Sequence, residues 1–174
     1  MVELLRGKIT RRISAPTDQH QAVVGELFGL IHTHLRRQPC HVRVAPYDVR
    51  LPQHGTTADQ AIYTVVQPDV CVICDPSKIE RRGCLGAPDL IVEVTAPSTA
   101  ARDWKDKFDL YAESGVGEYW IVTPLEQAVA VFVRDEATGR YQLVGEYAGP
   151  GSIPCATLPG LALDWSAIFT EPTR

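Results

Sequence analysis

Two acidic residues stand in otherwise apolar segments of this chain. Asp69 opens the segment Asp-Val-Cys-Val-Ile-Cys, and Glu93 lies within Leu-Ile-Val-Glu-Val-Thr. A carboxylate among apolar residues is costly to bury unless a cation or a bound proton compensates its charge. A divalent ion shared by two carboxylates provides that compensation and can activate water for hydrolysis of a phosphodiester bond. The residue types therefore suggest Asp69 and Glu93 as ligands of Mg²⁺ or Mn²⁺.

The two segments must pair for these carboxylates to meet. Each segment is opened by Pro-Asp, and residues 76–86, rich in Pro, Gly and charge, separate them. We expect two central strands in an antiparallel hairpin folded about Arg81, with Asp69 opposite Glu93. Directly opposed residues lie about 4.5–5.5 Å apart on one face. Asp89 lies roughly 13 Å from Glu93 along the strand, so we expect it to shape the strand start.

A lysine would complete the chemistry by orienting or deprotonating the attacking water. An E-x-K signature places that lysine two residues after the glutamate, but this chain has Thr95 there. Lys107 follows Asp103 by one turn of the next expected helix. It faces either the carboxylates, or solvent in a pair with Asp103.

Two helices are expected to flank the strands. The first runs from a cap at Thr17 or Asp18 to about residue 37, with apolar residues at helical spacing. The second is capped at Ser98 or Thr99 and runs to about Ser114, with Gly115 placed to end it. It leaves directly from the second central strand, so Lys107 follows closely after Glu93.

The remaining segments predict further strands. Residues 40–51 read as a strand broken at Pro46, and the tail 151–169 as packed loop and short helix. Three more strands are expected to form a meander: 118–124, 128–134 and 141–147. One mixed central sheet flanked by helices follows, an α/β fold in a single domain over residues 1–174.

The five cysteines are odd in number and scattered, which argues against a disulfide framework. Cys71 and Cys74 are three apart in a strand and point to opposite faces, so we interpret them as core thiols and not half a zinc site. The sequence holds no apolar run long enough for a signal peptide or a membrane span. We therefore expect a cytoplasmic protein with reduced thiols and no membrane contact.

The motifs together resemble a known family. Three segments occur in order: QPDV, APDLIVEVTAPST and GVGEYWIV. They are accompanied by Asp103, Lys107 and Tyr111 at a spacing of four residues, by an early His20 and by a closing LPGLALDW. This combination, over almost the whole chain, resembles the Uma-two family of putative restriction-endonuclease-like proteins in the PD-(D/E)XK superfamily.

The resemblance implies a restriction-endonuclease-like fold and assigns site residues. Asp69 and Glu93 match the family's metal ligands and Lys107 its migrated lysine, while Glu26 on the first helix corresponds to the accessory acid of related nucleases. The implied activity is Mg²⁺- or Mn²⁺-dependent endonucleolytic cleavage of DNA, a hydrolysis of phosphodiester bonds.

A second hypothesis is a catalytically inactive nuclease fold that binds DNA or protein. It is motivated by Thr95 at the lysine position and by a net charge of −4, which provides no global basic field for phosphate. For either function we expect a homodimer, because duplex cleavage needs two sites and meander strands such as 128–134 offer an edge or face for pairing. No glycine-rich phosphate loop, G-x-S-x-G elbow or Rossmann fingerprint occurs in the sequence.

Overall fold

The computed structural model describes residues 2–11, 15–52, 62–95 and 100–169. Its central sheet has six strands in the order β12-β11-β10-β9-β6-β3, and only the β9–β10 pair is parallel. Their bounds are β3 His41–Val44, β6 Val70–Ile73, β9 Leu90–Val94, β10 Glu118–Thr123, β11 Ala128–Arg134 and β12 Tyr141–Tyr147. The mixed central sheet and the 118–147 meander are confirmed.

The central hairpin has the predicted register. Strands β6 and β9 pair antiparallel through Val70 with Val92, and through Val72 with Leu90. Extending this ladder by one pair places Asp69 opposite Glu93. The symmetric fold about Arg81, inferred from the two Pro-Asp openings, is therefore confirmed.

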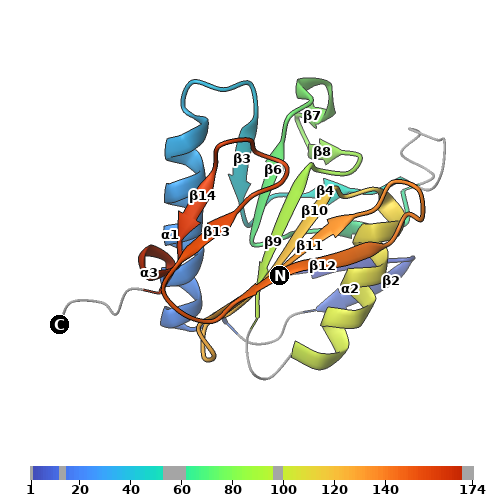
Figure 1. Ribbon diagram of the computed structural model, residues 1–174. Helices are drawn as coiled ribbons and strands as arrows, with labels where there is room; N and C mark the ends of the chain where they lie inside the picture. The colour runs from blue at the N-terminus through green and yellow to red at the C-terminus, as the bar shows by residue number, and fades with distance from the viewer. Residues whose placement is uncertain (1, 12–14, 53–61, 96–99, 170–174) are drawn as a thin grey trace.

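Helix α1 (Asp18–Leu35) covers one face of the central sheet (Figure 1). Thr17 is its N-cap and accepts a hydrogen bond from the backbone N–H of His20. The helix buries a stripe at helical spacing: Val23, Val24, Leu27, Ile31 and Leu35. The same core includes the ribbon of β13 (Ser152–Pro154) and β14 (Ala162–Asp164) and the short helix α3 (Trp165–Ile168). The short helix of the tail was predicted, whereas the ribbon was not.

Helix α2 (Ala100–Ser114) lies on the opposite side of the sheet (Figure 1). Leu110 and Tyr111 pack with Tyr119 and Ile121 of β10 in a second core. Gly115, at φ +90°, follows the helix in the left-handed conformation that glycine adopts most easily. The helix therefore ends where the sequence predicted.

A second six-stranded sheet, in the order β2-β1-β5-β4-β8-β7, was not predicted. Its strands are β1 Val2–Leu5, β2 Lys8–Arg11, β4 Val49–Arg50, β5 Val65–Val66, β7 Ile79–Glu80 and β8 Gly83–Leu85. The expectation of one sheet is thus wrong, because strands of two to four residues are too short to show a clear alternation. The break predicted at Pro46 is real, and it passes the chain from β3 in one sheet to β4 in the other.

The segment between the two central strands also contributes to this second sheet. Residues 76–86, which separate the two central strands, form a short 3-10 helix (η2, Pro76–Lys78) and the β7–β8 hairpin. Gly83 packs so tightly that a Cβ added there would lie 2.1 Å from the Asp48 carbonyl oxygen. Only glycine fits this crossing without moving the backbone.

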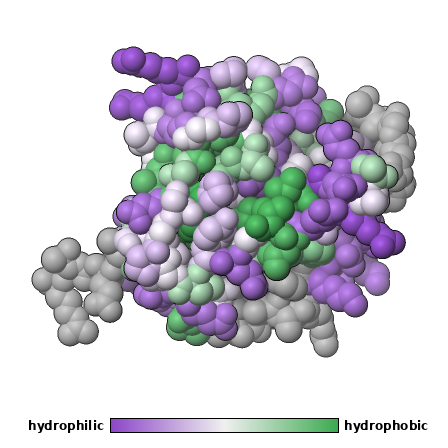
Figure 2. Space-filling view, viewed as in Figure 1, coloured by the Kyte–Doolittle hydropathy of each residue, from purple (hydrophilic) through white to green (hydrophobic). Residues whose placement is uncertain are grey.

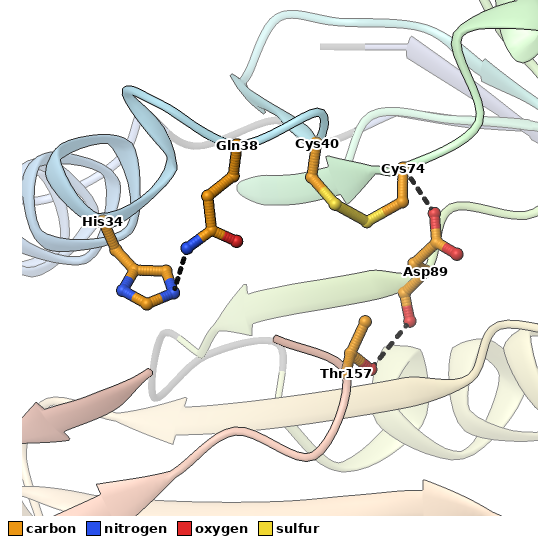
Figure 3. The surroundings of a disulfide bond; sticks show 6 residues. All are labelled: His34, Gln38, Cys40, Cys74, Asp89 and Thr157. Carbon is orange, nitrogen blue, oxygen red and sulfur yellow. Dashed lines mark hydrogen bonds between the residues drawn. A yellow bond between two sulfur atoms is a disulfide. The ribbon is translucent and has the colours of Figure 1, made fainter. Parts of the chain in front are cut away.

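The cysteines differ from the expectation. Cys40 and Cys74 form a disulfide, while Cys71, Cys84 and Cys155 are buried free thiols (Figure 3). His41 pairs with Ile73 in the β3–β6 ladder, so the next residues outward, Cys40 and Cys74, face each other. The prediction of core thiols holds for Cys71 and is wrong for Cys74. No helix among the described residues is long and apolar enough to cross a membrane.

Candidate active site

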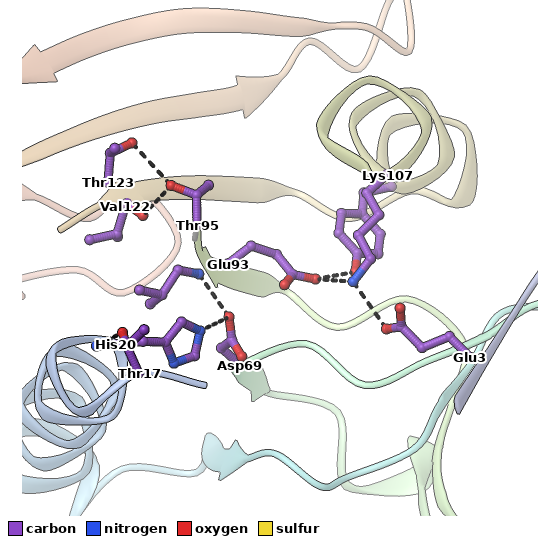
Figure 4. Close-up of polar contacts among 11 residues, drawn as sticks. Glu3, Thr17, His20, Asp69, Glu93, Thr95, Lys107, Val122 and Thr123 are labelled. Carbon is purple, nitrogen blue, oxygen red and sulfur yellow. Dashed lines mark hydrogen bonds and ion pairs between the residues drawn. The ribbon is translucent and has the colours of Figure 1, made fainter. Parts of the chain in front are cut away.

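Glu93 is the centre of a buried polar cluster near the end of β9. It is 4% exposed, and its Oε1 accepts hydrogen bonds from Lys107 Nζ (2.9 Å) and Tyr111 OH (2.7 Å). Lys107 and Tyr111 are four residues apart in α2, a spacing that places both on one face of the helix. The passage from β9 into α2 thus brings an ammonium and a hydroxyl to one carboxylate (Figure 4).

Glu3 joins this cluster from the second sheet. Lys107 Nζ also donates to Glu3 Oε1 at 3.0 Å, and the backbone N–H of Gln67 donates to the same oxygen at 2.9 Å. Glu3 is 5% exposed. Lys107 therefore bridges two buried carboxylates from different sheets. Sequence reasoning missed Glu3, because Val-Glu-Leu-Leu at the start of the chain carries no local sign of a site.

Asp69 lies immediately before β6 and is 3% exposed. Its Oδ2 accepts the backbone N–H of Val94 at 2.8 Å and lies 3.4 Å from Nε2 of His20. In Figure 4 the Asp69 carboxylate turns toward His20 of α1, whereas that of Glu93 turns toward Lys107 of α2. Asp69 thus bonds a nearby backbone N–H and still belongs to the same region of the fold. We call Glu3, Asp69, Glu93, Lys107 and Tyr111 the Glu93 cluster.

The Glu93 cluster is rich in carboxylates. Three buried carboxylates, Glu3, Asp69 and Glu93, accompany one obligate cation, Lys107. Carboxylate oxygens are the donors that Mg²⁺ and Mn²⁺ prefer. Among the described residues, however, no group of three or more His, Cys, Asp or Glu side chains is gathered closely enough to hold a metal ion. The cluster therefore has the donor types that a divalent ion prefers, but its described side chains do not converge on one position.

Tyr111 remains a hydrogen-bond donor in this environment. Burial, and next the neighbouring Glu93 carboxylate, raise the pKa of its phenol well above the usual range. The hydroxyl therefore stays protonated and holds Glu93 Oε1. This interaction fixes the carboxylate against α2.

A family model described as putative restriction endonuclease, Uma2, matches residues 1–166. The chain belongs to the Uma2 family. An uncharacterized protein of Synechocystis sp. is 34% identical over 70 residues, which cover 40% of this chain and 37% of that protein. A crystal structure described as a putative nuclease belonging to DUF820, from Anabaena variabilis, superposes with a TM-score of 0.74 at 20% identity, over 97% of this chain and 89% of that one. The structural likeness shows that this Uma2 chain has the fold of that protein.

In this Uma2 protein the lysine that contacts Glu93 comes from helix α2. Thr95, at the E-x-K lysine position, lies with its Oγ1 3.3 Å from the Val122 carbonyl oxygen and 3.4 Å from Thr123 Oγ1, beside β10. Lys107 of α2 contacts Glu93 instead. Of the two orientations considered for Lys107, the one toward the carboxylates is confirmed, and the side chain of Asp103 lies outside the described residues.

The other predicted residues lie elsewhere. Glu26 is exposed on α1, while His20 lies on that helix's buried face. Asp89 accepts the backbone N–H of Cys74 at 2.6 Å, which confirms its role at the strand start (Figure 3). Sequence reasoning thus missed the contact of His20 with Asp69, although it singled out His20 as a family feature.

A further buried carboxylate, Glu118, was also not singled out. It is fully buried at the start of β10 and accepts hydrogen bonds from Trp120 Nε1 (2.7 Å), Thr157 N (2.7 Å), Cys155 Sγ (3.2 Å) and Ala156 N (3.2 Å). We call these five residues the Glu118 anchor. They tie the loop between β13 and β14 to the central sheet, and all four donors are uncharged.

Proposed function

We propose that this Uma2 protein is a divalent-metal-dependent endonuclease that hydrolyses phosphodiester bonds in DNA. The observation that carries the proposal is the buried contact of Lys107 with Glu93 and Glu3. Asp69 lies on the neighbouring strand, opposite Glu93 when the β6–β9 ladder is extended by one pair. A buried ammonium beside several carboxylates is the combination that metal-assisted hydrolysis uses. Membership of a family described as putative restriction endonuclease supports the reaction class.

The proposal gives each residue a role. Asp69 and Glu93 would hold Mg²⁺ or Mn²⁺, which when bound lowers the pKa of a water molecule and stabilises the leaving oxygen. Lys107 directs its ammonium at the same carboxylate and orients the attacking water. Tyr111 fixes Glu93 by donating to Oε1. Glu3 holds Lys107 from the second sheet.

A plasmid-nicking assay with Mg²⁺ or Mn²⁺ tests the activity. The Glu93→Gln variant should lose nicking, because it removes a negative charge while retaining the shape of the side chain. Asp109→Asn, an exposed change on α2, is the matched control and should nick like the wild type. Equal nicking by wild type and Glu93→Gln would remove the proposed site, and no nicking by any protein would remove the activity.

The second candidate is a nuclease fold that binds DNA or protein without cleaving it. Two observations favour it: Thr95 occupies the E-x-K lysine position, and the described side chains gather no group of three metal donors. Binding of a fluorescent duplex that persists with EDTA, without any nicking, would support this candidate. Binding that requires Mg²⁺, together with nicking, would exclude it.

We further propose a homodimer that pairs through strand β12. The predicted strand 128–134 is β11, which lies inside the sheet between β10 and β12 and cannot offer an edge. Strand β12 is one of the two edges of this sheet, and its Leu143 and Val144 are more than half exposed. Figure 2 shows an apolar patch on the face where β12 crosses in front. Light scattering after size exclusion should give twice the chain mass, and Leu143→Glu should give the monomer. A monomeric wild type would contradict this.

A further inference from the structure

His20 lies on the first turn of α1 and faces Asp69. Its side chain is 7% exposed, and its Nε2 lies 3.4 Å from Asp69 Oδ2. Thr17, the helix cap, accepts the backbone N–H of His20, which fixes the position of this residue. Figure 4 shows the imidazole between the helix and the Asp69 carboxylate.

The surroundings of the ring define its protonation. An ionised carboxylate only accepts hydrogen bonds, so the nitrogen that faces Asp69 must carry the hydrogen. The other nitrogen, Nδ1, is buried without a hydrogen-bond partner among the described residues. A hydrogen on Nδ1 would be a buried unsatisfied donor, which costs about 1–3 kcal/mol. A hydrogen on Nε2, the nitrogen that faces Asp69, therefore fits this site best.

The two described contacts of the Asp69 carboxylate are both made to Oδ2, by groups from two different elements. The backbone N–H of Val94 approaches Oδ2 from β9, and His20 approaches it from α1. Two directions of approach define how the plane of a carboxylate is turned. Outer-shell partners of this kind orient a carboxylate ligand and set its affinity for a metal ion.

We infer that His20 is a positioning residue of the Glu93 cluster, which turns Asp69 for divalent-cation binding through its Nε2–H. The inference rests on the proposed function and extends it to a residue on α1. Removing the imidazole should weaken Mn²⁺ binding by about 10–100-fold, the range found for outer-shell partners of metal ligands. A histidine that only fills the core would leave this affinity unchanged.

The first test needs no metal. Long-range ¹H–¹⁵N spectra of histidine-labelled protein, assigned with His20→Gln, should show hydrogen on Nε2 and none on Nδ1 of His20. The signals should shift in Asp69→Asn, which changes the acceptor that the ring faces. A hydrogen on Nδ1, or signals that ignore Asp69→Asn, would overturn the inference whatever the protein does with metal.

The second test is calorimetric titration of Mn²⁺ into wild type and variants. His20→Leu keeps an apolar side chain in place but removes the donor, and should bind about 10–100-fold more weakly. His20→Gln places an amide nitrogen the same number of bonds from the backbone as Nε2, and should recover part of the affinity. His34→Ala, at a partly exposed histidine of the same helix that contacts Gln38, is the control and should bind normally.

The outcomes separate the inference from the proposed function. Wild-type affinity in His20→Leu would overturn the inference alone. No Mn²⁺ binding by the wild type would overturn the proposed function and the metal role of His20 together, even with the predicted spectra. Melting temperatures identify a folding defect, and if His20→Leu does not fold, His20→Asn replaces it because its amide is too short to reach Asp69.

Discussion

Glu93 and Glu118 are buried carboxylates on neighbouring strands, but their partners differ. Glu118 is surrounded by four uncharged donors from an indole, a thiol and two backbone amides. Glu93 accepts from a lysine that a second carboxylate, Glu3, shares. A carboxylate with a complete shell of neutral donors holds the fold together. A carboxylate in a group with excess negative charge points to a site.

The largest effect should follow from removing the shared cation. Lys107→Ala leaves Glu3 and Glu93 as buried carboxylates without their ammonium, which should lower the free energy of unfolding by about 3–5 kcal/mol. Urea denaturation measures the loss. Added Mg²⁺ should recover more stability in Lys107→Ala than in the wild type, because the variant has one more uncompensated charge. A stability loss under 1 kcal/mol, about the value of an exposed ion pair, would contradict the account of the Glu93 cluster.

The Glu118 anchor is connected to a disulfide through the hydrogen bonds of Asp89. Cys74 of the Cys40–Cys74 disulfide donates its N–H to Asp89, whose carbonyl oxygen accepts the Thr157 hydroxyl of the Glu118 anchor (Figure 3). Reduction should lower stability by about 2–4 kcal/mol, the usual contribution of a disulfide.

Two measurements check the disulfide. Thiol titration of the denatured protein should give three reactive thiols before reduction and five after it. Cys40→Ser should lose the sensitivity of the melting temperature to reductant. Five thiols in protein never exposed to reductant would contradict the disulfide.

Glu118→Gln should produce a purely structural defect. The amide keeps one acceptor oxygen but brings an NH₂ group against either the N–H of Thr157 or the N–H groups of Ala156 and the Trp120 indole, so stability should fall by about 1–3 kcal/mol. Nicking by the folded variant should equal that of the wild type. If Glu118→Gln had full stability but no activity, Glu118 would belong to the site, and the structural role assigned to the Glu118 anchor would be wrong.

The smallest effect near neutral pH is a dependence of stability on alkaline pH at the Glu118 anchor. Burial, and next Glu118, raise the pKa of the Cys155 thiol from 9.0 to about 12. A raised folded-state pKa favours the protonated thiol, so its contribution to stability is complete below about pH 9 and is lost as the pH rises toward 12. The loss is at most about 1.4 kcal/mol per pH unit. Cys155→Ala should reduce this slope in urea denaturation, and an unchanged slope would contradict it.

The sequence predicted the elements that carry the site better than the site's full membership. The two Pro-Asp openings and the spacing about Arg81 were enough for the β6–β9 register, and the helical stripe was enough for α1. The second sheet could not be predicted, because its short strands pair segments far apart in the chain. Glu3 is a case in point, since its partner Lys107 lies 104 positions away.

The cysteines show the same limit. Cys40 and Cys74 become neighbours only because β3 pairs with β6, and their spacing in the sequence contains no sign of that pairing. His20 and Glu26 lie on one predicted helix, but which of them faces the sheet depends on how that helix is rotated against it. The structure places His20 on the buried face and Glu26 on the exposed one.

The most direct test of the account is calorimetric titration of Mn²⁺ into wild type, Glu93→Gln and Glu118→Gln under the same conditions. We predict that the wild type and Glu118→Gln bind Mn²⁺ with equal affinity, and that Glu93→Gln does not bind it. Equal affinity in Glu93→Gln and the wild type, or no binding by any of the three, would contradict the assignment of the Glu93 cluster as a metal site.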